Sequence, residues 1–312
     1  MPVEFIGHIG SHNQSEIISP QGPIVDPQHI ETVAKIHENG GFDRVLVSFH
    51  SNSPESILVA QHAAAVAPDL GLLIAHRPGF NAPTIAARQF ATLDNITKGR
   101  VAVHIITGGS DLELQADGDH TTKAERYART SEYLDIVRQE WRETAPFDYK
   151  GQFYDVHGAN SLVRPYRDSS IPVYFGGSSS EAIDVAGKHA DVYALWGETY
   201  EQVAETVAHV RASAAKHGRS PRFSLSLRPI LADTEEAAWA RADHILATAR
   251  SLQEKTGFTK SSDIPHEASP RLLAATAPAS RLDKPLWTGI PPLTGATGTS
   301  TPQCAPPRQV AT

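Results

Sequence analysis

The chain has 312 residues and a formal net charge of −7. It has no long basic run, which argues against nucleic acid as the main partner. Its single cysteine, Cys304, excludes an intramolecular disulfide and a multi-thiolate metal site and suits a reducing cytoplasm. No apolar stretch approaches the ~18 residues that span a bilayer, and the first residues lack a signal-peptide pattern, so we expect a soluble protein without membrane association.

Strands and helices are predicted to alternate seven times along the chain. The predicted strands cover residues 3–9, 43–49, 71–75, 101–106, a segment starting at Ile171, 191–196 and 222–231. Helical patterns follow each of them, with a capping box at Thr122 and Glu125 and another at Thr199 and Gln202. The segment FDYKGQFYDV, from Phe147, predicts a hairpin inserted before the fifth strand. Seven such units favour an α/β fold of the (β/α)₈ TIM-barrel type over a doubly wound sheet.

An eighth strand–helix unit is not recognisable. After Ser251 neither strand nor helix periodicity persists, and nine of the 22 prolines lie between Pro265 and Pro307. We therefore predict a βα barrel over residues 1–250, a long insertion or lid loop over 251–301 and a disordered tail over 302–312.

Polar residues gather at the predicted carboxyl ends of the strands, where barrel enzymes carry their active sites. These positions are His8, His12, His50, Ser53, His76, Arg77, His104, Thr107, Trp196, Glu198 and Arg228. Because many of these residues are histidines and arginines, we predict a cationic rim around the carboxyl ends of the strands. Such a rim would suit a small anionic substrate.

Each of these residues also has a structural interpretation. A single histidine is more often a satisfied hydrogen-bonding group than a catalyst, and Trp196 is either a wall for a flat ligand or an ordinary core residue. Arg77 and Arg228 must each find an anion, either a protein carboxylate or a substrate. No carboxylate matches His8 and His12, so we expect no metal site.

The stretch IPVYFGGSSSE, residues 171–181, is the strongest ligand-site candidate. A strand runs directly into two glycines and three serines, and a helix follows. Free amides at a helix N-terminus, with glycines that allow close approach, suit a phosphate. A tight strand-to-helix turn with Ser180 as the N-cap explains the same residues equally well.

Five stretches, in order, resemble the luciferase-like flavin monooxygenases, and specifically their alkanesulfonate monooxygenase branch. They are IAHRPGFNAPTIAARQFATLDNITKGR, VHIITGGSDLELQADGD, ERY, PVYFGGSSSEA and ALWGET, and the similarity runs from about Val3 to Thr301. The resemblance implies a (β/α)₈ barrel that takes reduced FMN from a separate NAD(P)H-dependent reductase. It also implies a flavin peroxide formed with dioxygen, which converts an alkanesulfonate to an aldehyde and sulfite.

The resemblance also implies roles for individual residues. The FMN phosphate would contact Gly177, Ser178, Ser179, Tyr127 and His12, and Thr107 would line the isoalloxazine side. The candidate catalytic residues are Arg228, His50, Ser53 and Trp196, and the candidate substrate-binding residues are Arg77, Arg228 and Trp196.

Three positions depart from the sulfonate enzymes where the substrate is recognised. Ser53 stands where those enzymes have a cysteine, and the family's Arg-Leu-His is here Ser226-Leu227-Arg228. The arginine is thus displaced by two residues, which keeps it on the same strand face. Thr294 replaces a further arginine in the long loop. These three departures therefore weaken the prediction of a sulfonate substrate more than they weaken the prediction of an oxygenase.

From about Pro302 the sequence becomes proline-rich and unlike the family, as in a frameshifted or truncated reading frame. If the eighth strand is missing, the first and seventh strands have open edges. We then expect lower stability and a tendency to form homo-oligomers, and restoring the chain through the eighth strand should raise the stability measured by refolding.

Three functions remain open at this point. The leading one is a reduced-FMN-dependent monooxygenase that acts on a small organosulfur compound. The second is the same chemistry on a sulfone, an amine or a nitrogen heterocycle. The third is a truncated flavin-binding protein without turnover.

Overall fold

The computed structural model describes residues 3–15, 17–19, 21–168, 170–256, 281–282, 286–287 and 302–304. The chain divides into two compact units. The first contains Met1–Asn13, Gln21–Tyr193 and Val210–Arg222, and the second contains Gln14–Pro20, Ala194–His209 and Phe223–Thr312. Each unit is described by itself below.

A seven-stranded sheet organises the fold. Its order is β1 (Ile6–Ile9), β2 (Arg44–Val47), β3 (Gly71–His76), β4 (Val101–Ile105), β7 (Val173–Gly176), β8 (Val192–Trp196) and β9 (Arg222–Ser226). The pairs from β1 to β7 are all parallel. No eighth strand joins this sheet among the residues that the structure describes.

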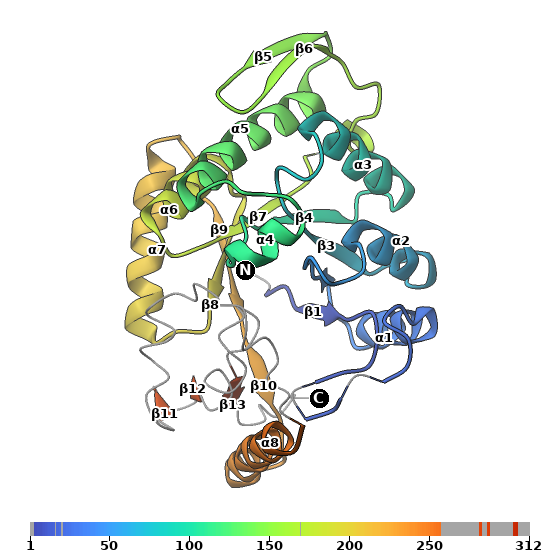
Figure 1. Cartoon of the computed structure of the whole chain (residues 1–312), viewed down its shortest axis with the longest axis vertical. Coiled ribbons are helices and arrows are strands. Elements are labelled where there is room, and N and C mark those ends of the chain that lie inside the picture. The colour runs from blue at the N-terminus through green and yellow to red at the C-terminus, as the bar shows by residue number, and fades with distance from the viewer. Residues whose placement is uncertain are drawn as a thin grey trace. The chain divides into compact units, whose positions relative to one another are not determined.

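Helices connect the strands. They are α1 (Pro27–Asn39), α2 (Ser56–Val66), α3 (Pro83–Ile96), α4 (Asp111–Ala116), α5 (Lys123–Arg142), α6 (Ser180–His189), α7 (Tyr200–Ala215) and α8 (Glu235–Thr256). In the first unit, α1, α2, α3 and α5 follow one another along one side of the strands (Figure 1). The prediction of an α/β fold built from seven strand–helix units is confirmed.

Local sequence signals explain several helix boundaries. Thr122 and Glu125 form a capping box in which the Thr122 hydroxyl accepts from the Glu125 amide, and Glu125 accepts from the Thr122 amide. Pro83 begins α3, where its missing N–H costs no helical hydrogen bond. α1 ends before Gly40. The capping box predicted at Thr122 and Glu125 is therefore confirmed.

The core of the first unit includes a cluster between the strands. Leu73, Ala102, Tyr174 and Val192 are buried together, and Ile6 and Leu46 pack against them. The parallel register places Leu46 beside Leu73 and Leu73 beside Ala102. These side chains therefore share one face of the sheet, since alternate residues of a strand point to the same side.

The predicted hairpin exists as β5 (Phe147–Lys150) and β6 (Asp155–Ala159), which pair antiparallel. Glu132 of α5 holds its turn: the carboxylate accepts from the amides of Gln152, Phe153 and Tyr154 at 2.7, 2.9 and 3.3 Å. Glu140, further along α5, accepts from the Ser161 amide at 2.8 Å. Helix α5 thus anchors both the hairpin turn and the segment that follows β6.

The second unit differs in detail from the prediction. The expected strand over residues 222–231 is interrupted, and β10 (Arg228–Ile230) belongs instead to a small sheet ordered β10-β13-β12-β11. This sheet contains β11 (Arg281–Leu282), β12 (Leu286–Trp287) and β13 (Pro302–Cys304). A buried apolar cluster in the second unit joins β10 to α8 and contains Ile230, Ala238, Trp239, Ala242 and Ala249.

α8 continues to Thr256, beyond the boundary expected at residue 250. The remainder of the predicted lid loop over 251–301 and of the predicted tail over 302–312 lies outside the described residues, apart from the strands named above. No described helix is long and apolar enough to cross a membrane.

Candidate functional site

Most of the candidate residues of the first unit follow the carboxyl ends of four neighbouring strands. His50 and Ser53 follow β2, Arg77 follows β3, Thr107 follows β4 and Gly177 follows β7. Because these strands are parallel neighbours in one sheet, their carboxyl ends lie along one edge. Such an edge is where α/β enzymes bind ligands.

The loop after β7 has a backbone that only glycine adopts comfortably. Gly177 has φ of +143°, and a Cβ there would lie 2.7 Å from Ala182 Cβ and 3.3 Å from Tyr127 Oη. The hydroxyl of Tyr193 donates to the Gly177 carbonyl oxygen. The loop is therefore held from the sheet side, and a side chain at this position would fill the space between the loop and Tyr127.

Tyr127 reaches this loop from the first turns of α5. Its side chain is 7% exposed, and its ring packs against Phe175 with centroids 6.5 Å apart. The capping box at Thr122 fixes the start of the helix that carries it. The structure thus brings Tyr127 and Gly177 together. Their shared contact with a phosphate stays a prediction.

The helix cap at this loop differs from the prediction. Ser179, not Ser180, is the N-cap of α6, and its hydroxyl accepts from the Ala182 amide at 3.2 Å. Ser180 is the first helical residue and donates to Glu181 at 3.2 Å. The N-cap prediction was therefore wrong by one residue, because the chain turns into the helix one position earlier. Ser178 remains exposed.

One negative charge also stands in the first turn of α6. Its own backbone amide, followed by the hydroxyls of Ser179 and Ser180, lowers the pKa of Glu181 below its usual value. The positive end of the helix is therefore already partly balanced by a carboxylate before any anion binds. Lys123, at the start of α5, is close enough to favour this charge.

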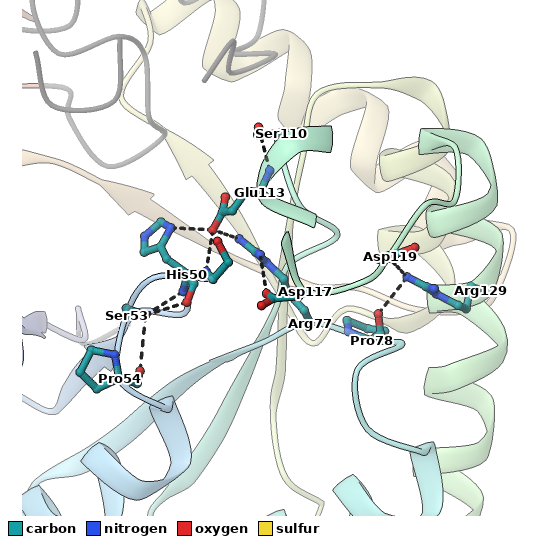
Figure 2. Close-up of polar contacts among 11 residues, drawn as sticks. His50, Ser53, Pro54, Arg77, Pro78, Ser110, Glu113, Asp117, Asp119 and Arg129 are labelled. Atoms are coloured by element: carbon teal, nitrogen blue, oxygen red, sulfur yellow. Dashed lines mark hydrogen bonds and ion pairs between the residues drawn. The ribbon is translucent and has the colours of Figure 1, made fainter. Parts of the chain in front are cut away.

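A second cluster joins the segments after β2 and β3 to α4. Glu113 Oε1 accepts from Arg77 Nη2 at 2.5 Å and from the Ser51 amide at 3.1 Å, and it lies 3.2 Å from His50 Nδ1 (Figure 2). The Arg77 and Glu113 side chains are 4% and 9% exposed. Asp117 Oδ2 lies 4.0 Å from Arg77 Nη1. Arg77 thus has a protein carboxylate as its anion.

This environment keeps Glu113 ionised. Burial by itself would raise the pKa of Glu113, but the hydrogen bond from His50, the charge and hydrogen bond of Arg77 and the Ser51 amide outweigh it and lower the pKa to about 2. The favourable contacts dominate because three donors meet one oxygen. The guanidinium also lies over the Phe49 ring, 5.3 Å from its centroid.

The turn after β2 is closed by Ser53. Its hydroxyl accepts from the His50 amide at 2.9 Å and donates to the His50 carbonyl oxygen at 3.0 Å. His50 itself is half-buried, with 41% of its side chain exposed. Ser53 therefore fixes the backbone of His50, while the imidazole remains accessible. Its predicted catalytic role stays a prediction.

Arg129 fixes the segment after β3 in a similar way. Arg129 of α5 donates to Asp119 and, at 3.2 Å, to the Pro78 carbonyl oxygen (Figure 2). Burial opposes ionisation, but the hydrogen bonds from Arg129 and Thr121 prevail and lower the pKa of Asp119 to about 2. The strand end that carries Arg77 is thereby tied to the helix that carries Tyr127.

Two other predicted cofactor residues have ordinary local surroundings. His12 Nδ1 lies 3.2 Å from both Ser11 Oγ and the Ile24 carbonyl oxygen. Thr107 is half-buried and lies two residues after the end of β4. Their predicted contacts with FMN stay predictions.

Trp196 and Arg228 belong to the second unit. Trp196 ends β8 and Arg228 begins β10, and both are half-buried. Their predicted catalytic and substrate-binding roles also stay predictions.

The expected cationic rim is weaker than its composition suggests. His76 is buried, and its Nε2 lies 2.6 Å from Tyr133 Oη. Burial lowers the pKa of His76 to about 4 and that of His104 to about 4. Both imidazoles are therefore neutral near pH 7, and His76 has the structural role that a single histidine most often has.

Glu113 is the residue that the sequence analysis missed. Ser110 and Glu113 have the spacing of a capping box, and Ser110 does cap α4, but the Glu113 side chain turns to Arg77 and His50 instead of to Ser110. The spacing would have located the helix without revealing this contact. Arg77 and Glu113 are far apart in sequence, and only the fold brings them together.

Comparison with solved structures shows the same fold. A riboflavin lyase, solved with modified FMN and riboflavin, is 19% identical with a TM-score of 0.71, covering 85% of this chain and 72% of that one. EDTA monooxygenase from Chelativorans sp. BNC1 is 19% identical with a TM-score of 0.70, covering 81% and 68%. DmoA from Hyphomicrobium sulfonivorans is 19% identical with a TM-score of 0.68, covering 82% and 67%.

Sequence comparison identifies the family. The model of the luciferase-like monooxygenases matches residues 3–303, which is nearly the whole chain. The candidate residues after β2, β3 and β4 and the loop after β7 lie within this match. The chain belongs to the luciferase-like monooxygenase family.

Proposed function

We propose that the chain is a monooxygenase that uses reduced FMN and dioxygen to oxygenate a small organosulfur compound of the alkanesulfonate type, with an aldehyde and sulfite as products. Family membership supports the monooxygenase class. A separate NAD(P)H-dependent reductase would supply the reduced FMN, and a cytoplasmic location suits that supply.

The loop after β7 is the observation that carries the FMN assignment. Gly177 lacks a Cβ where one would approach Tyr127 Oη, the start of α6 offers backbone amides, and Ser178 is exposed. Backbone amides at a helix N-terminus and a nearby exposed hydroxyl are groups that bind phosphate, which supports the assignment. The riboflavin lyase of the same fold was solved with modified FMN, which supports the choice of flavin.

When bound, reduced FMN supplies the electrons that activate dioxygen. The chain's own residues bind the flavin, orient the substrate and exclude water. Arg77 is ion-paired with Glu113. We keep Arg77 and Arg228 as candidate contacts for an anionic substrate and Trp196 as a candidate wall for the bound ligands. The rigid Arg77–Glu113 pair then shapes the edge of the site and supports His50.

The same chemistry on a sulfone, an amine or a nitrogen heterocycle is the second candidate. It is favoured by Ser53, whose hydroxyl is engaged in the turn after β2 where the sulfonate enzymes have a cysteine. EDTA monooxygenase has the same fold, which makes a polyamine carboxylate a sensible member of the substrate panel. A flavin-binding protein without turnover is the third candidate.

Two measurements separate these candidates. Anaerobic titration with reduced FMN tests the cofactor, and we expect saturable binding. Air, a reductase and a panel of sulfonates, sulfones and amines are then added, with sulfite and oxygenated products as readouts. We expect sulfite from at least one sulfonate.

Each other outcome assigns a different function. Oxygenated product without sulfite would select the second candidate, and binding without any product would select the third. Failure to bind reduced FMN would overturn all three.

A further inference from the structure

We propose that Glu113 is a positioning residue that fixes His50 in the tautomer with hydrogen on Nδ1, so that Nε2 faces the bound substrate as a hydrogen-bond acceptor. This inference rests on the proposed function for its consequence in catalysis. Its structural content, the tautomer of His50, is independent of any flavin or substrate.

The carboxylate is built into the fold before it meets His50. Glu113 Oε1 accepts from Arg77 Nη2 at 2.5 Å and from the Ser51 amide at 3.1 Å. Ser110 caps α4 and accepts from the Glu113 amide at 3.4 Å. The position of the carboxylate is therefore set by a buried arginine, a backbone amide and a helix cap, and His50 adapts to it.

The chemistry of the pair then decides the tautomer. An ionised carboxylate only accepts hydrogen bonds, and Glu113 is ionised throughout the neutral range because its pKa is lowered to about 2. The ring nitrogen 3.2 Å from Oε1 is Nδ1, so Nδ1 carries the hydrogen. In a neutral imidazole the other nitrogen, Nε2, then has a free lone pair.

Hydrogen bonds fix the backbone around His50. Its amide donates to Ser53 Oγ at 2.9 Å, and its carbonyl oxygen accepts from the same hydroxyl at 3.0 Å. The next amide, of Ser51, is bonded to Glu113 itself. In Figure 2 the second ring nitrogen points away from Glu113, and 41% of the side chain is exposed.

This tautomer defines which reactant group His50 can meet. Nε2 pairs with an O–H or N–H group of the substrate. If it takes that proton, the electron pair of the broken bond stays on the substrate atom, and the new imidazolium faces the negative charge of Glu113. A carboxylate that holds Nδ1–H of a histidine in this way orients the ring and stabilises its protonated form.

A direct measurement is available on the unmodified full-length chain. With ¹⁵N-labelled histidine, long-range ¹H–¹⁵N spectra distinguish the two neutral tautomers, and His50→Gln identifies the His50 signals by their loss. We expect the Nδ1–H pattern for His50. An Nε2–H pattern, which is the ordinary preference of the free side chain, would overturn the proposal, as would an even mixture.

Three variants separate positioning from support of the fold. Glu113→Gln keeps an acceptor oxygen and should retain the Nδ1–H pattern, whereas Glu113→Ala should shift His50 to the Nε2–H pattern. Asp117→Asn removes a charge from the segment that ends α4, 4.0 Å from Arg77, and should leave the tautomer unchanged. A shift in Asp117→Asn equal to that in Glu113→Ala would show a general charge effect and overturn the proposal.

Turnover provides the second readout. Once a substrate that the protein oxygenates is identified, its turnover can be measured in each variant. We expect Glu113→Ala to lower kcat by about tenfold or more with a smaller change in KM, and Glu113→Gln to recover part of kcat. An unchanged kcat would overturn the role in catalysis even if the tautomer is as expected. Since the spectra need neither flavin nor substrate, failure of the proposed function would leave the tautomer result standing. If Glu113→Ala does not fold, the spectrum of the unmodified chain still decides.

Discussion

The hydroxyl of Tyr127 lies 3.3 Å from the point that a Cβ on Gly177 would occupy, so the helix before the hairpin and the loop after β7 face each other across the space of a single side chain. Ala182 closes the same space from α6, at 2.7 Å. The Gly177 backbone is therefore packed closely between α5 and the first turn of α6.

Gly177→Ala is expected to weaken FMN binding by about tenfold or more, because a methyl group would clash with Ala182 and displace the loop, and because φ of +143° is strained for alanine. Isothermal titration with FMN measures the loss. Gly218→Ala is the matched control: Gly218 has φ of +64° and no atom within 4 Å of a Cβ, so it tests left-handed strain alone. Equal affinity losses in the two variants would contradict a phosphate site at Gly177.

Tyr127→Phe removes one hydroxyl without changing the packing against Phe175. A hydrogen bond to a charged group contributes about 1.5–3 kcal/mol, so FMN affinity should fall by about tenfold or more while the melting temperature hardly changes. Riboflavin, which lacks the phosphate, should bind both proteins equally. Tyr149→Phe, which loses a hydroxyl facing Asp135, serves as the control for hydroxyl removal. A loss of riboflavin affinity equal to that of FMN would place Tyr127 elsewhere on the flavin.

Glu181→Gln is expected to strengthen FMN binding by about two- to threefold at low salt, because it removes a negative charge from the first turn of α6. The gain should shrink as salt is added, since the carboxylate is exposed and screening is effective there. Glu201→Gln makes the same change in the first turn of α7 and should leave the affinity unchanged. Weaker binding by Glu181→Gln would mean that the phosphate does not approach this helix end.

Acid stability should report the ionisation of Glu113. Its pKa is about 2 in the folded protein against an ordinary 4.5, so its contribution is complete above the ordinary value and is lost as the pH falls toward 2. Between pH 6 and pH 3 the free energy of unfolding should fall by about 2 kcal/mol more in the unmodified protein than in Glu113→Gln. Urea unfolding at both pH values measures this difference. Parallel losses in the two proteins would show that Glu113 is not held ionised by its neighbours.

Much of the fold could be predicted because its signals are local. Alternating apolar strands and capped helices gave the order of the seven units, and the capping box at Thr122 and the hairpin from Phe147 are present as expected. Each of these signals depends on residues a few positions apart. The N-cap at α6 was assigned one residue too late because Ser179 and Ser180 are equally good caps, and only the path of the chain decides between them.

The site was harder to predict because its partners are distant in sequence. Arg77 was expected to need an anion, but Glu113 could be identified only after folding placed α4 beside the ends of β2 and β3. His76 was placed on the cationic rim, whereas burial against Tyr133 makes it neutral. Charge at a strand end therefore depends on desolvation, which the sequence pattern does not contain.

Helix α5 carries both Tyr127 and the two carboxylates that anchor the hairpin. Tyr127 lies near the start of the helix. Glu132, which holds the hairpin turn, and Glu140, which holds the segment after β6, lie further along it. At a rise of 1.5 Å per residue, Tyr127 and Glu140 are about 20 Å apart along the axis. Glu132, however, is only five residues from Tyr127, about 7.5 Å along the axis, so the hairpin turn is anchored near the middle of the helix. A change in the hairpin turn therefore acts on α5 close to Tyr127, whereas a change at Ser161 acts on its far end.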